Sequence, residues 1–182
     1  MLRHATVEDV PQILQIYGPY ILQTSFTFEY EVPTLEQFSQ RFLAITQQFP
    51  WLVWEENGQI LGYAYADRAF ARAAYQWTAD LSVYLRPEAR GKGIGRKLYE
   101  AAEEILQNQG YFALYAIVTD GNLDSCAFHR ALGYREIAHL PQCGYKHNSW
   151  HGIYWFEKRL REGEPTAPPA APYENTQNKE TI

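Results

Sequence analysis

One stretch, residues 78–108, constrains the fold of this chain more than any other. Apolar and more polar side chains alternate over residues 81–85, which is the pattern of a β-strand with one buried face. Pro87 has no N–H to donate and therefore ends the strand. From Ile94 onward the apolar side chains instead recur with the period of an amphipathic helix. The stretch predicts a strand, a short loop and a helix.

The loop between this strand and this helix reads Arg-Gly-Lys-Gly-Ile-Gly over residues 90–95. Its alternating glycines allow a sharp turn and a close approach by a ligand. The first helical turn presents unpaired N–H groups, and the helix dipole favours an anion there. Basic side chains gather at the same place: Arg86, Arg90, Lys92, Arg96 and Lys97. These features predict a phosphate-binding site, although a solvated basic helix start would show a similar pattern.

The spacing of the glycines narrows the kind of phosphate ligand. The dinucleotide fingerprint needs a different glycine spacing, and the Walker pattern GxxxxGK[ST] is absent. The net charge of −5 argues against a nucleic-acid partner, because binding a phosphate backbone usually needs a basic excess. A local basic cluster in an acidic chain suits one small anionic ligand instead.

The composition is that of an ordered globular protein. Of 182 residues, 46% are hydrophobic and 15% are aromatic, which suffices for one domain with a substantial core. Cys126 and Cys143 are too few for a disulfide framework or a cysteine metal site. No apolar run approaches the roughly 18 residues of a membrane span, and the first residues lack a signal-peptide pattern. We therefore expect a cytoplasmic protein with no metal and no membrane partner.

The remaining sequence predicts the element order β-α-α-β-β-β-α-β-α-β-β. This order indicates an α/β domain with a mixed, mostly antiparallel sheet. Two capping residues, Thr6 and Thr34, predict helix starts, and the first of these helices is expected to reach Tyr17. The dipeptide at residues 57–58, Asn-Gly, predicts a tight turn between two strands.

The C-terminal part of the chain changes character. Two closing strands are predicted at 134–140 and 150–158, joined by a loop. From Arg161 the sequence is rich in proline and poor in apolar residues, so it cannot bury enough surface to order itself. We expect a folded domain over residues 1–160 and a flexible tail over residues 161–182.

Several segments of the chain resemble one enzyme family. The loop at 90–95 and the element order are similar to those of the GCN5-related N-acetyltransferases, abbreviated GNAT. Within that superfamily the chain resembles the phosphinothricin (bialaphos-resistance) N-acetyltransferases at YQWTADLSVYL (75–85), HRALGY (129–134) and GYKHNSWH (144–151). The likeness covers roughly residues 2–160 on an element-by-element comparison. It implies the GNAT fold, a twisted sheet flanked by helices whose central parallel strands splay apart.

The resemblance implies acetyl-CoA as the co-substrate. In the family the pantetheine arm pairs with the backbone of the central strand, here at Val83, Tyr84 and Leu85. The glycine loop holds the pyrophosphate, here with Arg90, Gly91, Lys92, Gly93, Ile94 and Gly95. Asn122 and Ser125 match positions that contact CoA, and Asn122 can serve as a helix N-cap as well.

Three residues are candidates for moving protons. Asp80 lies where the family has a glutamate that is taken as the base acting through water, and its side chain is shorter by one methylene. His147 is a second candidate base, because histidines titrate near neutral pH. His129 lies where many GNAT enzymes have a tyrosine that protonates the CoA thiolate, which makes it a candidate acid. A solvated Asp80 and structural histidines remain the alternatives.

The resemblance also implies an amino-acid substrate with a carboxylate and a tetrahedral phosphinate or sulfoximine group. Arg72 is the candidate cation for that carboxylate, with Tyr75 beside it, although Arg72 could equally be a surface arginine. Phe26 and Phe28 belong to an aromatic segment that can close the pocket and that the family associates with a homodimeric site. The predicted reaction is direct attack of the α-amino group on acetyl-CoA in a ternary complex.

Two other functions stay open at this point. A protein N-terminal acetyltransferase would need a peptide-wide groove, whereas Phe26, Phe28, Tyr30 and Tyr75 indicate a narrow pocket. A non-catalytic acyl-CoA-binding module is the other, because Asp80 departs from the family's glutamate. The physiological substrate, among phosphinothricin, methionine sulfoximine and related methionine derivatives, is not fixed by the sequence.

Overall fold

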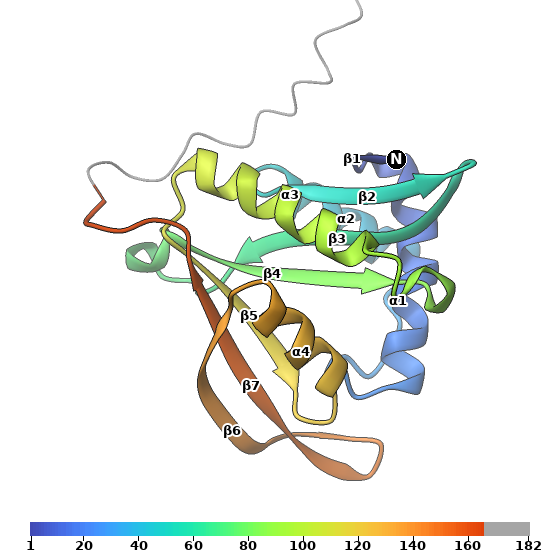
Figure 1. Cartoon of the computed structure of the whole chain (residues 1–182). Coiled ribbons are helices and arrows are strands. Elements are labelled where there is room, and N and C mark those ends of the chain that lie inside the picture. Colours follow the sequence, from blue (N-terminus) through green and yellow to red (C-terminus); the bar gives the residue numbers. More distant parts are fainter. Residues whose placement is uncertain (166–182) are drawn as a thin grey trace, which may run out of the picture.

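Seven strands form one mixed sheet in the computed structural model, which describes residues 1–165 (Figure 1). Their order across the sheet is β1-β2-β3-β4-β5-β7-β6, and each neighbouring pair is antiparallel except β4 and β5. The strands are β1 (Leu2–His4), β2 (Trp51–Glu56), β3 (Gln59–Arg68), β4 (Thr78–Leu85), β5 (Ala113–Thr119), β6 (Arg135–Lys146) and β7 (Ser149–Arg159). The predicted sheet type and the predicted order of helices and strands are confirmed.

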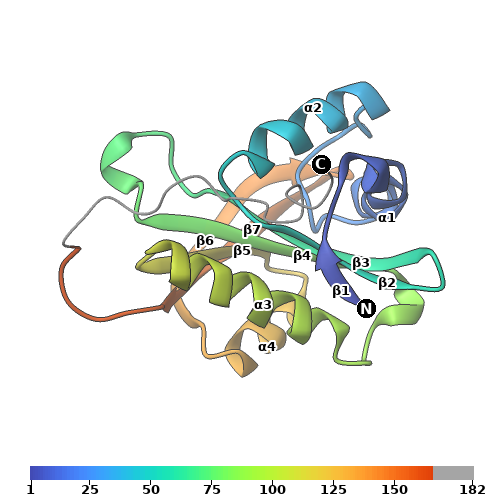
Figure 2. The ribbon, with the colours of Figure 1, turned by 90° about the horizontal axis from the view of Figure 1, so that it is seen from above.

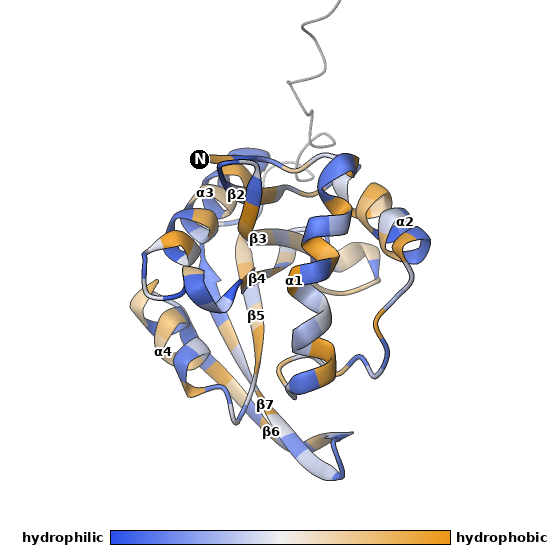
Figure 3. Cartoon of the chain, turned by 90° about the vertical axis from the view of Figure 1, so that its right-hand side faces the viewer, coloured by the Kyte–Doolittle hydropathy of each residue, from blue (hydrophilic) through white to orange (hydrophobic). Residues whose placement is uncertain are grey.

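The α-helices of the described residues cover both faces of this sheet (Figure 2). They are α1 (Val10–Gln23) and α2 (Leu35–Thr46) on one face, and α3 (Ile94–Gln109) and α4 (Leu123–Ala131) on the other. The strands between them are largely hydrophobic, whereas each helix mixes hydrophobic and hydrophilic residues (Figure 3). Fully buried side chains such as Trp51, Tyr63 and Leu98 form the core on the two faces.

Local sequence signals set several of these boundaries. Thr34 caps α2: its hydroxyl accepts from the N–H of Gln37, whose side chain accepts from the Thr34 N–H in return. Thr6 opens a 3₁₀ turn that leads into α1. Asn57 and Gly58, with φ angles of 52° and 78°, form the predicted turn between β2 and β3.

The first helix is longer than the sequence predicts. It was expected to end at Tyr17, but α1 continues to Gln23 and includes Pro19. Pro19 removes one helical hydrogen bond. The six additional residues nevertheless bury Ile21 completely, which favours the longer helix. As a consequence, Tyr20 comes to lie against β4.

The hairpin of β6 and β7 is also longer than predicted. The segment expected as a loop, 141–149, belongs mostly to the two strands, and the turn consists of His147 and Asn148 alone. Pro141 is tolerated because β6 is an edge strand, where one side needs no partner. The register with β7 shifts at this point, and Gln142 takes up the irregularity with a φ of 50°.

β4 and β5 run parallel but pair only where β4 begins. Thr78–Asp80 pairs with Ala113–Tyr115, and beyond these residues β5 diverges from β4 (Figure 1). The divergence opens a gap along residues 81–85 of β4, and the start of α4 lies at this gap. The predicted splay of the central parallel strands is therefore present.

Of the tail predicted over 161–182, residues 166–182 lie outside the described part of the chain. Among the described helices, none combines the length and the hydrophobicity needed to cross a bilayer. Within residues 1–165, no group of three or more His, Cys, Asp or Glu side chains is arranged to hold a metal ion.

Candidate functional site

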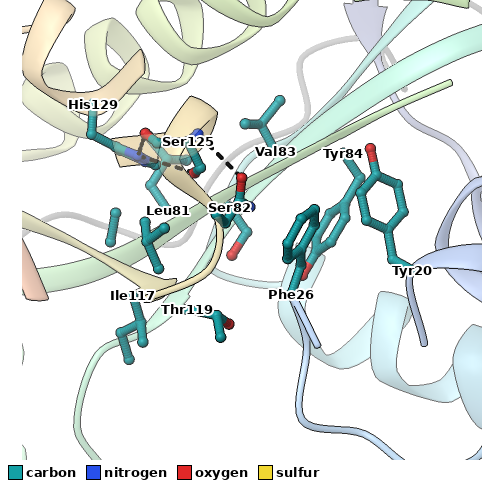
Figure 4. Close-up of a pocket in the computed structure, with 13 residues that line it drawn as sticks. Tyr20, Phe26, Leu81, Ser82, Val83, Tyr84, Ile117, Thr119, Ser125 and His129 are labelled. Atoms are coloured by element: carbon teal, nitrogen blue, oxygen red, sulfur yellow. Dashed lines mark hydrogen bonds between the residues drawn. The ribbon is translucent and has the colours of Figure 1, made fainter. Parts of the chain in front are cut away.

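The gap between β4 and β5 leaves one edge of β4 facing a cleft (Figure 4). In a β-ladder the N–H and C=O groups of alternate residues point to opposite edges. Tyr99 Oη donates to the Leu81 carbonyl at 2.6 Å, and Tyr20 Oη donates to the Leu85 carbonyl at 2.7 Å. Leu81 and Leu85 therefore point their backbone groups toward the gap. Val83 lies between them in the same alternation, so its N–H and C=O face the gap as well.

The three residues predicted to pair with a pantetheine arm differ in whether their backbone N–H and C=O groups are free to bind a ligand. Val83 lines the cleft with its backbone groups available. Leu85 is already engaged, because its carbonyl and its N–H both contact Tyr20 Oη, at 2.7 and 3.3 Å. Tyr84 points its backbone toward β3, and its ring packs edge-on against Tyr17 of α1 with centroids 5.0 Å apart. Val83 is therefore the position on this edge best placed to pair with a ligand.

The glycine loop leads into the N-terminus of α3, as the sequence predicts. Gly91 and Gly93 have φ angles of 73° and 75°, a conformation that residues with side chains rarely adopt. No atom lies within 4 Å of where a Cβ would stand on either glycine, so the space beside the loop is open. Lys92 between them is exposed, and the first turn of α3 contains no acidic residue. The geometry favours an anion at this helix start.

A cleft of about 570 Å³ joins this loop to the start of α4. Its lining includes Arg90, Gly91 and Gly95 on one side and Asn122 and Ser125 on the other. Residues predicted from separate segments therefore share one cleft. An anion site joined to an open strand edge fits the phosphates and the extended arm of acetyl-CoA. Ile94, which was predicted with the loop, instead points its side chain into the core, where it is buried.

Asn122 and Ser125 have structural roles at this cleft as well. Asn122 Oδ1 accepts a hydrogen bond from the Ser125 N–H at 3.2 Å and so caps α4. The cap fixes the first turn of α4 beside the gap and orders Ser125 next to His129, one helical turn further on (Figure 4). The predicted N-cap role of Asn122 is confirmed.

His129 is buried beside the same gap and forms a chain of hydrogen bonds with its neighbours. Its Nδ1 donates to the Ser125 carbonyl at 2.7 Å, and its Nε2 lies 2.9 Å from Tyr99 Oη. Burial lowers the pKa of His129 to about 4, so the neutral ring prevails. In the neutral ring, Nε2 is a hydrogen-bond acceptor and so is the Leu81 carbonyl. The Tyr99 hydroxyl lies between them and has only one proton to donate. Protonation of His129 would satisfy every contact in this chain, but burial opposes the charged ring.

The side chain of Asp80 lies on the face of β4 opposite to that of Leu81 and Val83, because successive side chains on a strand alternate between the two faces. Its Oδ1 is buried and has no hydrogen-bond partner among the described residues. Removal of the carboxyl from water raises the pKa of Asp80 to about 7, and the charge of Asp67 adds to this effect. A carboxylate with this pKa can accept a proton near neutral pH. The residue as a whole is partly exposed, and the buried Oδ1 is the part of the side chain that is withdrawn from water.

His147 lies elsewhere, at the turn between β6 and β7. It is exposed, and its Nε2 lies 3.2 Å from the Thr24 carbonyl, to which it can only donate. A nitrogen engaged in this way offers no lone pair to a substrate proton. Neither cleft along β4 is lined by His147, so the structure does not bring it together with Asp80 or His129 there.

The four predicted substrate residues come from two segments. Phe26 lines the clefts along β4, and Phe28 lies so close to Gly144 of β6 that a Cβ there would overlap its ring. Arg72 and Tyr75 lie in the connector between β3 and β4, and both are exposed. The guanidinium of Arg72 forms no ion pair among the described residues, which leaves it available to a carboxylate.

Sequence reasoning missed three residues at this site: Tyr20, Tyr99 and Asp67. Tyr20 was overlooked because the first helix was predicted to end before it. Tyr99 looks like an ordinary core residue of α3, and its role depends on its contact with β4. Asp67 lies near the end of β3, and only the register of β3 on β4 places it opposite Asp80. No local pattern marks such residues, because each is defined by a contact across the fold.

Known proteins are similar to this chain in architecture and in sequence. A phosphinothricin N-acetyltransferase from Streptomyces viridochromogenes is 32% identical over 168 residues, which cover 92% of this chain and 90% of that protein. An L-methionine sulfoximine/L-methionine sulfone acetyltransferase from Pseudomonas paraeruginosa is 34% identical, over 87% of this chain and 94% of that protein. The crystal structure of a GNAT superfamily phosphinothricin acetyltransferase from Sinorhizobium meliloti, in complex with AcCoA, superposes with a TM-score of 0.88 at 34% identity. It covers 97% of this chain and 96% of its own.

The family comparison agrees with the geometry. Residues 2–155 match the model of the acetyltransferase (GNAT) domain. The match includes the glycine loop, the open edge of β4 and the capped start of α4, the parts from which the cleft is built. The chain therefore belongs to the GNAT acetyltransferase family and is an acyltransferase.

Proposed function

We propose that this enzyme transfers the acetyl group of acetyl-CoA to the α-amino group of a small amino acid by direct attack in a ternary complex. The acceptors we propose are phosphinothricin, methionine sulfoximine or a related methionine derivative. The observation that carries the proposal is the position of β4, which has an open backbone edge beside the nucleotide cleft and, on one face, a carboxyl with one buried oxygen that has no hydrogen-bond partner among the described residues. The names of the two relatives support the choice of acceptor.

On the nucleotide side, the protein contributes mainly backbone groups. The glycine loop and the start of α3 hold the pyrophosphate, assisted by the charges of Arg90 and Lys92. The edge of β4 at Val83 pairs with the pantetheine arm. When bound, acetyl-CoA supplies an acetyl group activated as a thioester. The Val83 N–H then points at the place where an acyl oxygen gains negative charge, which is how a backbone donor stabilises an acyl-transfer transition state.

On the acceptor side, Asp80 handles the proton. An α-amino group is mostly protonated at neutral pH and must lose a proton before it can attack. Asp80 takes that proton, directly or through one water, because its raised pKa makes it a suitable base. On the opposite face of β4, His129 with the hydroxyl of Tyr99 is the group that can hold a proton for the departing thiolate.

The residues proposed to select the amino-acid substrate come from the connector before β4 and from the aromatic segment after α1. Arg72 is the counter-charge for the acceptor's carboxylate, and Tyr75 lies in the same connector. Phe26 and Phe28 come from the aromatic segment that follows α1. Ser25 next to them contacts His151 of β7 at 3.0 Å, so this segment is fixed against the β6–β7 hairpin. A pocket closed by aromatic side chains favours a small amino acid over a peptide.

The proposal includes a homodimer. The β6–β7 hairpin exposes large apolar side chains, namely Ile137, Leu140, Tyr145 and Trp150. Ile137, Leu140 and Tyr145 lie on the edge strand β6, and exposed apolar side chains at a sheet edge are the usual sign of a contact with another chain. Light scattering after size-exclusion chromatography should give twice the 21.1 kDa mass of the chain, and a monomer at all concentrations would remove this part of the proposal.

The test is release of thiol from acetyl-CoA by the purified protein, with one acceptor in each assay. L-phosphinothricin, L-methionine sulfoximine and a short peptide with a free N-terminus are the three acceptors. We expect thiol release with the amino acids and none with the peptide. Turnover with the peptide alone would move the assignment to a protein N-terminal acetyltransferase. Tight binding of acetyl-CoA without turnover on a wider panel of amines would indicate a non-catalytic acyl-CoA-binding module.

A further inference from the structure

Two carboxylates face each other at the start of β4. Asp67 of β3 and Asp80 of β4 are direct partners in the antiparallel register. Side chains of directly opposite residues leave the same face of a sheet, with Cβ atoms about 4.5–5.5 Å apart. Like charges at this distance destabilise the folded state unless the pair binds a cation or shares a proton. The pairing therefore calls for a physical explanation.

Within residues 1–165, no lysine or arginine is paired with either member of this carboxylate pair. Among the described residues, neither carboxylate forms an ion pair, and Asp80 Oδ1 has no hydrogen-bond partner. Asp67 Oδ1 accepts one bond, from the backbone N–H of Arg68 at 2.6 Å. An unpartnered oxygen in a desolvated place is costly. Such an oxygen is expected in a site whose hydrogen-bonding partner is the ammonium group of a substrate or a proton.

The other titratable groups near Asp80 are phenols. Tyr65 of β3, Tyr84 of β4 and Tyr99 of α3 interact with its charge, as does Tyr134 near β6, and Tyr115 of β5 is its parallel partner. Burial raises the pKa of each phenol above its ordinary value, so all of them are neutral near pH 7. Within the described part of the chain, Asp67 is therefore the group that brings charge to Asp80 at neutral pH.

The proposed reaction requires a way out for a proton. Its balance is R–NH₃⁺ + CH₃CO–S–CoA → R–NH–CO–CH₃ + HS–CoA + H⁺, so each turnover releases one proton at the site. Asp80 is partly exposed as a residue, but its Oδ1 is buried, and Asp80 does not line the surface cleft beside α2. Asp67 instead lines a surface cleft of about 510 Å³ between β3 and α2, together with Arg41, Gln48, Tyr65 and Arg68.

We propose that Asp67 is the outer member of a carboxylate pair: it accepts the proton that Asp80 takes from the amine and releases it to solvent through the cleft beside α2. The step breaks the Asp80 O–H bond and forms an Asp67 O–H bond, directly or through one water, and the proton then passes to bulk water. The pair also binds the acceptor's ammonium before the transfer. This inference rests on the proposed acetyltransferase reaction.

The first test is the pH profile of kcat/KM for thiol release, compared between the wild type and Asp67→Asn. Asp67 raises the proton affinity of Asp80 by repulsion, so its neutralisation should move the acidic limb of the profile to lower pH by about one unit. We also expect kcat in dilute buffer to fall several-fold and to recover when imidazole is added as an external proton acceptor. An unchanged limb with no buffer dependence would overturn the inference.

Two control variants separate this role from a structural one. Asp67→Glu keeps the charge and should keep the acidic limb within a few tenths of a unit of the wild type. Glu104→Gln removes one charge from an exposed position of α3 and should leave the profile unchanged. If Asp67→Glu shifted the limb as much as Asp67→Asn, the charge of Asp67 would not be the cause. Thermal unfolding of each variant reports its stability independently.

A second measurement does not depend on turnover. The carboxyl carbon of Asp80 can be titrated by ¹³C NMR in the free wild type and in Asp67→Asn, with Asp80→Asn to assign the signal. We expect the Asp80 midpoint to fall in Asp67→Asn, and identical midpoints would refute the carboxylate pair even if the enzyme is active. Conversely, a shifted midpoint in a protein that acetylates none of the amines would keep the pair and reject the proposed function.

Discussion

The two sides of β4 are built by different means. On the proposed nucleotide side, the groups come from the backbone: the glycine loop at 90–95, the start of α3 and the edge at Val83. On the proposed acceptor side, they come from side chains, above all Asp80 and Asp67, which strand register brings together. Backbone groups depend on local conformation, whereas side-chain groups depend on long-range packing. The two sides should therefore respond differently to substitution.

The largest expected effect is on the acceptor side, from Asp80→Asn. The amide cannot accept the amine's proton, so kcat/KM for the amino acid should fall by about a hundredfold or more. Binding of acetyl-CoA, which uses the other side of β4, should stay within twofold by calorimetry. Asp80→Glu serves as the control, because it restores a carboxylate and should retain most of the activity. A fully active Asp80→Asn enzyme would show that another group is the base.

The same substitution should change how stability depends on pH. The pKa of Asp80 is about 7 in the folded protein, above its ordinary value of 3.8, so between these values the folded chain holds a proton that the unfolded chain has released. The free energy of unfolding therefore falls as pH rises through this window. Asp80→Asn should flatten this dependence and should be more stable than the wild type at pH 8. Urea unfolding of both proteins at pH 5 and pH 8 measures these free energies of unfolding. An equal change between the two pH values in the wild type and in Asp80→Asn would contradict the raised pKa.

On the nucleotide side, Gly93→Ala should act through conformation alone. Gly93 has a φ of 75°, and an added Cβ would meet no atom within 4 Å, so the cost is backbone strain of about 1–2 kcal/mol. If the loop relaxes to relieve the strain, acetyl-CoA affinity should fall about tenfold, while the acidic limb of the pH profile stays in place. Gly58→Ala is the matched control, because Gly58 has a φ of 78° and similarly open space in a distant turn. It should lower stability without changing acetyl-CoA affinity.

The same contrast explains what could be predicted from the sequence. The glycine loop, the caps at Thr34 and Asn122 and the Asn57–Gly58 turn are local patterns, and each lies where the sequence places it. The second half of β6, from Pro141, was mistaken for a loop because a proline in a strand is tolerated only on an edge, and edges are a property of the whole sheet. Likewise the Asp67–Asp80 pair depends on strand register, which no local pattern reveals.

Tyr99→Phe examines the point where the two sides meet. Its hydroxyl is buried between the Leu81 carbonyl of β4 and the ring of His129, at 2.6 and 2.9 Å. The variant leaves both groups without this partner, so the free energy of unfolding should fall by about 1–3 kcal/mol. We expect kcat to fall less than in Asp80→Asn, because the base remains. A loss of kcat as large as that of Asp80→Asn, with stability unchanged, would instead make Tyr99 essential to proton transfer.

The smallest expected effect comes from His147→Ala. His147 lies exposed at the β6–β7 turn, and its one hydrogen bond to the Thr24 carbonyl holds the aromatic segment against the hairpin. Its removal should raise KM for the amino acid about two- to threefold, in line with the loss of one exposed hydrogen bond. The acidic limb of the kcat/KM profile should not move, because that limb belongs to Asp80. If the acidic limb of the profile were lost in His147→Ala and kept in Asp80→Asn, the base would be the histidine. The acceptor side would then be organised around the β6–β7 hairpin and not around β4.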